Sequence, residues 1–183
     1  MPKLLSTFLF GVFGAAAVVL AIAAVNRPRP HASLEAKPLV GDVWVSEQIQ
    51  AGDFGVLKQK QFKSIIDLRP DGEAPNQPAS FRVEWFAKSS GMTFAYVPVP
   101  HGDIPAQSVD ALSTALASAQ KPTLLYCRSG KRAARTWALV EASRNGGMDA
   151  AAIEAAVASV GQSADDLHQL ISTRIAARAA TAP

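Results

Sequence analysis

Short apolar segments alternate with longer amphipathic segments along most of the chain. Four apolar segments of strand length stand between polar breaks, at residues 43–45, 62–68, 93–99 and 123–126. Segments with helical spacing of apolar side chains lie between and after them, at residues 53–61, 80–90, 108–119, 132–144, 149–159 and 163–178. This alternation predicts an α/β fold with a mostly parallel central sheet flanked by helices.

The same pattern predicts which side chains face the core and where chemistry is placed. In the helix 80–90, the spacing of Phe81, Trp85 and Phe86 predicts a core-facing stripe, and Trp137 is expected to pack against the sheet. Functional groups of parallel sheets lie beyond the carboxyl ends of the strands. Cys127 follows the strand 123–126 directly and is therefore at such an end.

The beginning of the chain has a different pattern. Residues 4–25, LLSTFLFGVFGAAAVVLAIAAV, are 22 residues without a charge. As a helix they would be about 33 Å long, which matches a hydrocarbon core of roughly 30 Å. They predict an N-terminal transmembrane helix that anchors the protein to a membrane. The alternative is a signal segment that is cleaved after Ala23, although the apolar part of a signal segment is normally shorter than these 22 residues. The positive charges on the two sides of the segment balance, so the sequence does not predict on which side of the membrane the rest of the chain lies.

Changes in composition suggest the domain boundaries. Residues 1–26 form the anchor or signal segment, and the proline-containing residues 27–38 an extended linker. Residues 39–147 contain the alternating pattern and form the main α/β domain, which includes Cys127, and residues 148–183 form a C-terminal helical extension.

Charge and composition exclude several functions. The chain has 18 Lys and Arg against 15 Asp and Glu, a net charge of +3, which is too small and too dispersed to predict nucleic-acid binding. One cysteine cannot form an internal disulfide. The three histidines are scattered and no glycine-rich nucleotide motif is present, so neither a metal nor a cofactor is expected.

The segment TLLYCRSGKRAARTWAL, residues 123–139, surrounds the single cysteine with a basic loop. Gly130 allows the loop to curl with its amides inward, and the following helix adds its free N–H groups and its dipole. Arg132 can hold two oxygens of an oxyanion. We therefore expect an anion-binding loop that favours the ionised thiolate of Cys127. Its substrate-binding residues would be Arg128, Ser129, Gly130 and Lys131, and Arg128, Lys131 and Arg135 would attract anions to the entrance.

A simpler interpretation of the same residues is structural. Free cysteine is among the most buried residue types, so Cys127 could end a buried strand, and the basic residues could form a solvated turn. The spacing of Cys127 and Arg132 is a weak pattern by itself. The strand before it, the glycine within it and the helix after it favour a reactive cysteine.

Several segments resemble a known family. YCRSGKRAARTWAL is similar to the active-site segment of the beta-lactamase hydrolase-like protein phosphatase-like domain family. FKSIIDLRPDGEAPNQP, YVPVPHGDI and GDVWVSEQIQAGDFGVLKQKQF resemble other parts of its pattern, so the resemblance covers residues 39–144. It implies a fold like that of protein tyrosine and dual-specificity phosphatases, with Cys127 as nucleophile and Arg132 as oxyanion binder. The family is also described as sulfurtransferase-like, because its loop is shaped like that of rhodaneses.

Two departures from the tyrosine phosphatase pattern bear on the reaction. Four residues separate Cys127 from Arg132, the rhodanese length, where tyrosine phosphatases have five. A tighter loop offers less room for a tetrahedral phosphoryl group and suits a single persulfide sulfur better. Ala133 also stands where these loops usually place Ser or Thr, whose hydroxyl stabilises the departing thiolate; Ser129 is a candidate substitute.

Cleavage of a phosphate ester needs a proton donor for the leaving alkoxide. Asp103, in HGDIP after the strand 93–99, is the candidate catalytic acid, and His101 is a second possible donor. A solvated turn aspartate is the structural alternative for Asp103.

The strand 62–68 and the loop after it add further charged residues. Asp67 lies inside a buried strand and is expected to bond to the backbone or to Arg69 rather than to react. Arg69, Asp71 and Glu73 are expected either at the rim of the site or in a salt-bridged loop.

Three functions are compatible with these residues. The first is a cysteine-dependent, phosphatase-like hydrolase of phosphate monoesters, in which Cys127 attacks phosphorus and Asp103 protonates the leaving group. The second is a rhodanese-like sulfurtransferase that forms a persulfide on Cys127 and does not need Asp103. The third is a non-catalytic anion-binding module. The resemblance favours the hydrolase, acting on an anionic small molecule or a phosphoprotein, with the membrane as a further partner through the N-terminal helix.

Overall fold

A five-stranded sheet is at the centre of the part of the chain that the computed structural model describes, residues 34–180. Its strands lie in the order β1-β2-β5-β3-β4. They are β1 (Lys37–Val40), β2 (Val43–Ser46), β3 (Ser64–Asp67), β4 (Thr93–Tyr96) and β5 (Thr123–Tyr126). The pairs β2–β5, β5–β3 and β3–β4 are parallel, whereas β1 pairs antiparallel with β2. The sheet is therefore mixed, with the parallel centre that the sequence predicts.

The antiparallel edge strand follows from its connection. Only Gly41 and Asp42 separate β1 from β2, and a two-residue connection can join only antiparallel neighbours. Gly41 has a φ of +53°, which a residue with a side chain rarely adopts, so glycine makes the hairpin possible. The sequence pattern did not predict β1, because residues 27–38 were interpreted as a linker.

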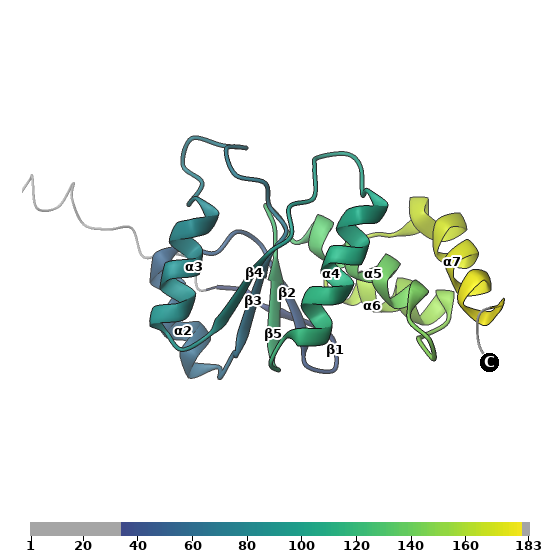
Figure 1. Cartoon of the computed structure of the whole chain (residues 1–183), viewed down its shortest axis with the longest axis horizontal. Helices are drawn as coiled ribbons and strands as arrows, with labels where there is room; N and C mark the ends of the chain where they lie inside the picture. Colours follow the sequence, from purple (N-terminus) through teal and green to yellow (C-terminus); the bar gives the residue numbers. More distant parts are fainter. Residues whose placement is uncertain (1–33, 181–183) are drawn as a thin grey trace, which may run out of the picture. The chain divides into compact units, whose positions relative to one another are not determined.

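Helices cover both faces of the sheet (Figure 1). On one face lie α2 (Phe54–Gln59), which follows the short helix η1 (Ala51–Asp53), and α3 (Ser80–Ser89). On the other lie α4 (Ala106–Ser118), α5 (Lys131–Ser143) and α6 (Ala150–Ser159). The short helix η2 (Asp165–Leu167) leads into α7 (His168–Ala180), which packs against α5 and α6.

The two central strands supply side chains to both cores. Every residue of β3 and β5 is buried, and alternate side chains point to opposite faces. Ile65 and Leu124 belong to the core under α2 and α3, and Ile66 and Leu125 to the core under α4 and α5. This double burial explains why both strands are short apolar runs.

Helix α5 is the most deeply buried helix near the candidate site. Nine of its residues are buried, including Trp137, which is 4% exposed and packs in the core as the sequence predicts. Ala133 and Ala134 are fully buried in its first turn, and their small side chains allow the helix backbone to lie close to the sheet. The residues that begin α5 are therefore held in place by the core.

The predicted core-facing stripe of α3 is wrong in two positions. Phe81 and Trp85 are 68% and 62% exposed, whereas Val83 and Ala87 are buried. Phe86 is partly buried and stacks on Phe54 with ring centroids 5.6 Å apart. The buried face of α3 therefore contains the smaller residues Val83 and Ala87, which are four positions apart and share one side of the helix. The prediction is wrong because it is based on the size of the aromatic side chains.

The start of the described chain already packs into this unit. Leu34 is 8% exposed in the core under α2 and α3, three residues before β1. The predicted anchor, residues 4–25, lies outside the described residues. Among the helices of residues 34–180, none is both long enough and apolar enough to span a bilayer.

Candidate active site

Cys127 lies where the sequence places it, immediately after β5 and before the loop that leads into α5. Because β5 pairs with β2 on one side and β3 on the other, this loop is at the middle of the sheet's carboxyl edge. Cys127 is only 1% exposed. Its side chain belongs to the core under α5, so the burial that the structural interpretation expects for this cysteine is present.

Gly130 makes the short loop possible. Its φ is +81°, and it occupies the position directly before α5. A Cβ atom there would lie 3.1 Å from Cγ1 of Val45 and 3.4 Å from the carbonyl oxygen of Ser46. Both the backbone angle and the close approach of β2 therefore require glycine. The first hydrogen bond of the helix runs from the N–H of Ala134 to the carbonyl oxygen of Gly130, at 3.0 Å, so the preceding N–H groups face the loop.

A cavity of about 510 Å³ opens beside this loop. Its lining contains most of the residues that the sequence predicts for the site, including Asp103. Four cations line it: Arg128, Lys131, Arg132 and Arg135. The other lining residues are His101, Gly102, Asp103, Ile104, Ser129 and Asp166. Cys127 and Gly130 are not part of this lining, whereas Arg128 and Ser129, which lie between them, are.

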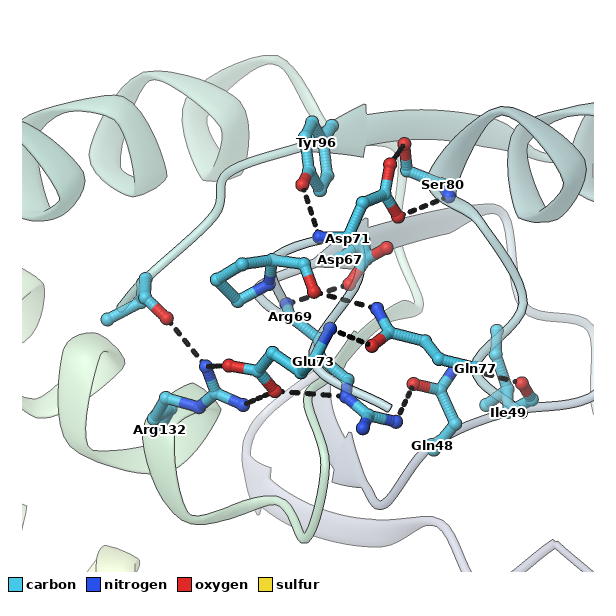
Figure 2. A network of polar contacts seen from close by, with 12 residues as sticks. Gln48, Ile49, Asp67, Arg69, Asp71, Glu73, Gln77, Ser80, Tyr96 and Arg132 are labelled. Atoms are coloured by element: carbon cyan, nitrogen blue, oxygen red, sulfur yellow. Dashed lines mark hydrogen bonds and ion pairs between the residues drawn. The ribbon is translucent and has the colours of Figure 1, made fainter. Parts of the chain in front are cut away.

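Arg132, the predicted oxyanion binder, is held by a carboxylate that the sequence did not assign to it (Figure 2). Its Nη1 and Nη2 donate to the two oxygens of Glu73, at 2.6 and 2.7 Å, and Nη1 also donates to the carbonyl oxygen of Val99 at 2.7 Å. Glu73 also accepts from Nε of Arg69 at 3.1 Å. The predicted salt-bridged loop is thus present, and its carboxylate reaches the catalytic loop.

The bonds of Arg132 leave part of its guanidinium available. Three of its five N–H groups donate to Glu73 and Val99, so Nε–H and one Nη2–H remain for Cys127 and an anion. Burial lowers the pKa of Arg132, but hydrogen bonding to Glu73 and the charge of Cys127 outweigh it and raise this pKa. Hydrogen bonding to Arg132 holds the pKa of Glu73 below its usual range. Arg132 can therefore bind an oxyanion while Glu73 fixes its orientation.

Asp67 has a structural role, as the sequence suggests. It is 1% exposed, and its Oδ1 accepts from the backbone N–H of Arg69 at 2.8 Å. Burial raises its pKa to about 6, against the lowering effect of Tyr126 and the Arg69 N–H. The Tyr126 hydroxyl, also buried, has no partner of good geometry among the described residues. Asp67 and Tyr126, the residue before Cys127, are thus buried polar neighbours that influence each other's pKa without a well-formed hydrogen bond between them.

Replacing Asp67 by asparagine is expected to raise the free energy of unfolding at neutral pH by on the order of 2 kcal/mol. The native pKa of about 6 lies above the usual 3.8, so the folded state binds a proton more tightly than the unfolded state. The cost of the buried charge is absent below about pH 4, grows as the pH rises through 6 and is constant above it. Asparagine keeps an oxygen for the Arg69 N–H. Urea unfolding at about pH 4, 5.5 and 7 tests this, and a difference between the two proteins that is independent of pH would contradict it.

Asp103 lies on the rim of the cavity, on the loop between β4 and α4. It is exposed, and its Oδ1 accepts from the N–H of Ile104 at 2.8 Å. Gly102 before it has a φ of +92°, which bends the chain and turns His101 and Asp103 to the same cavity. The structure thus brings the predicted proton donors and the basic loop together around one space.

Two residues near the site come from the C-terminal helices and were not predicted. Gln162 donates to the carbonyl oxygen of Ser129 at 3.1 Å, and Asp166 forms an ion pair with Arg135. Nothing in the local pattern around either residue indicates a partner in the loop. Across residues 34–180, no three His, Cys, Asp or Glu side chains are grouped as metal ligands.

Fold comparison gives the class of protein to which this arrangement belongs. A Neisseria meningitidis protein described as a phosphatase has a TM-score of 0.67 and 26% identity, over 75% of this chain and 96% of that chain. The core catalytic domain of the PP-IP phosphatase SIW14 from S. cerevisiae has a TM-score of 0.58 and 22% identity, over 83% and 97%. A kinase associated phosphatase whose catalytic-site cysteine was substituted by serine has a TM-score of 0.60 and 14% identity, over 80% and 98%. The fold is therefore phosphatase-like.

Sequence comparison identifies the family. The family model for the beta-lactamase hydrolase-like protein, phosphatase-like domain, matches residues 35–144, which is more than half of the chain. The chain belongs to this family. Beta-lactamase hydrolase-like proteins of Xylella fastidiosa and Agrobacterium fabrum are each 35% identical to it, over 97 and 98 residues. These matches cover 53% and 54% of this chain but 22% and 23% of those relatives, so the chain corresponds to less than a quarter of their length.

Proposed function

We propose that the protein is a cysteine-dependent hydrolase of phosphate monoesters, with Cys127 as nucleophile. The observation that carries the proposal is that one short loop connects a cysteine at the end of β5 to the start of α5, where Arg132 lines a basic cavity. The phosphatase-like fold supports it, as does the catalytic-site cysteine of the kinase associated phosphatase with the same fold. Arg132 and the N–H groups that begin α5 are the donors that a phosphoryl group would need.

The reaction has two steps. The Cys127 thiolate attacks phosphorus and forms an S–P bond, while the P–O bond to the leaving group breaks and Asp103 gives that oxygen a proton. A water molecule then attacks the thiophosphate; Asp103 takes up a proton from it, phosphate leaves and the thiolate is restored. Arg132, oriented by Glu73, stabilises the charge on the phosphoryl oxygens in both steps.

The burial of Cys127 sets a condition on the first step. A side chain that is 1% exposed must be uncovered by a small movement of the loop before sulfur and phosphorus meet. Arg128 and Ser129 are the exposed residues between the buried strand and the buried helix. Their carbonyl oxygens accept hydrogen bonds from the N–H of Gln48 at 3.4 Å and from Gln162 at 3.1 Å, so this movement would have to break or stretch these two bonds. Binding of an anion to the amides of Arg128 and Ser129 would favour the open loop.

Sulfur transfer is the second candidate, and two features of the loop favour it. Four residues separate Cys127 from Arg132, and the side chain of Ala133 is completely buried, with no hydroxyl to stabilise a departing thiolate. In this reaction Cys127 takes the sulfane sulfur of thiosulfate, releases sulfite and becomes a persulfide. Cyanide or another thiol then removes that sulfur and restores the thiolate. No proton donor is required.

Assays of the full-length protein with an aryl phosphate and with thiosulfate plus cyanide distinguish these functions. Hydrolysis of the aryl phosphate is expected. Turnover of thiosulfate alone would replace the first proposal by the second. Absence of both activities would leave a binding module, and titration with inorganic phosphate would then test whether the cavity binds anions at all.

Replacement of Asp103 by asparagine is expected to slow phosphate cleavage by about 10²-fold, because asparagine cannot protonate the leaving group. Sulfur transfer should be unchanged by this substitution. Rates with alkyl and nitrophenyl phosphates provide the measurement, since a good leaving group needs the proton less and should show a smaller loss. Asp110→Asn, at an exposed position of α4, is the matched control. Equal losses with both esters would contradict the assignment of Asp103.

A further inference from the structure

We propose that Asp166 determines the charge selectivity of the cavity: by binding Arg135, it restricts the site to ligands with one compact anionic group. The inference rests on the proposed role of the cavity as an anion site. It concerns residues outside the part of the chain that the family model matches, residues 35–144. The observation behind it is that Asp166, from the C-terminal segment, lies in the lining of the cavity.

The contact between Asp166 and Arg135 is a bidentate ion pair. Nη1 of Arg135 donates to Oδ1 of Asp166 at 2.5 Å, and Nη2 donates to Oδ2 at 2.6 Å. Nη1 also donates to the carbonyl oxygen of Ser163 at 3.3 Å. The Arg135 side chain is 14% exposed and that of Asp166 is 66% exposed. The cation is therefore enclosed, and its carboxylate partner faces the solvent at the lining of the cavity.

The segment that holds Asp166 is fixed by buried residues. Val160 and Ala164 are 3% and 2% exposed and belong to the same core as Cys127. Between them, Gln162 donates to the carbonyl oxygen of Ser129 in the catalytic loop. The buried residues Val160 and Ala164, which come just before Asp166 in the chain, thus help to hold Asp166 at the cavity, in addition to its ion pair with Arg135.

The charge of the lining, and not the volume of the cavity, limits which ligands can bind there. A volume of about 510 Å³ is within the range of small-molecule sites, roughly 300 to 1,000 Å³. Among the four cations of the lining, Arg132 is bonded to Glu73 and Arg135 to Asp166. Glu73 is shared with a further cation, Arg69. With Asp103 also on the rim, five cations and three carboxylates leave two formal positive charges, which match one dianionic group. One phosphoryl or sulfane-sulfur oxyanion is favoured there, whereas a second anionic group would meet Asp166.

Removal of the Asp166 charge should therefore change the preference between ligands with one and with two anionic groups more than it changes the affinity for a single anionic group. The test uses full-length protein carrying Cys127→Ser, which cannot turn over, and isothermal titration with inorganic phosphate and with pyrophosphate. Asp166→Asn is expected to tighten pyrophosphate binding about threefold to fivefold, the size of one solvent-exposed charge interaction, and to change phosphate binding by less than about twofold. Asp166→Asn combined with Arg135→Ala should remove the gain.

The control and the contrary outcomes are specific. Glu154→Gln breaks the exposed pair with His168, in the same C-terminal helices but away from the cavity lining, and should change neither affinity. Equal effects of Asp166→Asn on both anions, or none, in a variant with unchanged thermal unfolding, would overturn the inference and leave the proposed function intact. If the parent protein binds neither anion, the proposed function fails as well.

Discussion

Replacement of Cys127 by serine is expected to abolish turnover, with a loss of about 10³-fold or more in kcat for whichever substrate the protein uses. A thiol is partly ionised at neutral pH and its thiolate is intrinsically nucleophilic, whereas a serine hydroxyl at this position has no adjacent base. Both proposed reactions form a bond to the sulfur of Cys127. The substitution should therefore lower kcat by a similar factor in either reaction, whether the assay follows release of an aryl alcohol from an aryl phosphate or of thiocyanate from thiosulfate and cyanide.

This substitution tests chemistry without a large change in packing. Serine is nearly isosteric with cysteine, and the side chain lies in the core under α5, so a stability cost of about 1 kcal/mol is expected from burying a hydroxyl. Thermal unfolding of the variant checks that the fold is retained. Removal of a nucleophile lowers the activity far more than tenfold. A folded variant that keeps more than about a tenth of the original activity would therefore show that Cys127 is not the nucleophile.

The second large effect is expected at Arg132. Arg132→Lys should lower kcat/KM by about 10²-fold or more, because lysine keeps the charge but not the planar fork that binds two oxygens. It also cannot reproduce both bonds to Glu73 and the bond to Val99 while it faces an anion. Steady-state rates with the preferred substrate give the measurement.

Arg128→Lys is the matched control for this prediction. Arg128 lines the same cavity but is exposed, and no ion pair or hydrogen bond of its side chain joins it to another described residue. A conservative change there should reduce kcat/KM by less than about fivefold, the size of a solvent-screened charge effect. Equal losses at Arg128 and Arg132 would mean that the cavity attracts anions without using Arg132 in the transition state.

The local part of the site could be predicted from the sequence, because its determinants are adjacent along the chain. An apolar strand, a glycine and a helix within residues 123–139 place Cys127 at the strand end and require Gly130 before α5. Asp103 reached the same cavity because loops that follow parallel strands share one edge of the sheet. The parallel centre of the sheet followed from the alternation of elements in the same way.

The partners of the predicted residues could not be foreseen. Glu73 is 59 residues from Arg132 and Asp166 is 31 residues from Arg135, and no spacing rule connects them. The structural alternative for Cys127 did expect its burial, but the loop pattern could not choose between the two interpretations, because burial depends on how closely α5 packs. On α3, amphipathic spacing allowed two faces, and the prediction chose the one with the larger side chains.

The packing of residues 160–166 has a practical consequence for where the protein can be divided. The matched family region ends at residue 144, but Gln162 donates a hydrogen bond to the loop between Cys127 and α5, and Ile171 is fully buried in the same core as Cys127. A shortened protein that ends with the homologous region would expose apolar surface of α5 and leave one side of the anion cavity open. The stretch that the family model matches is therefore shorter than the stretch that lines and supports the cavity.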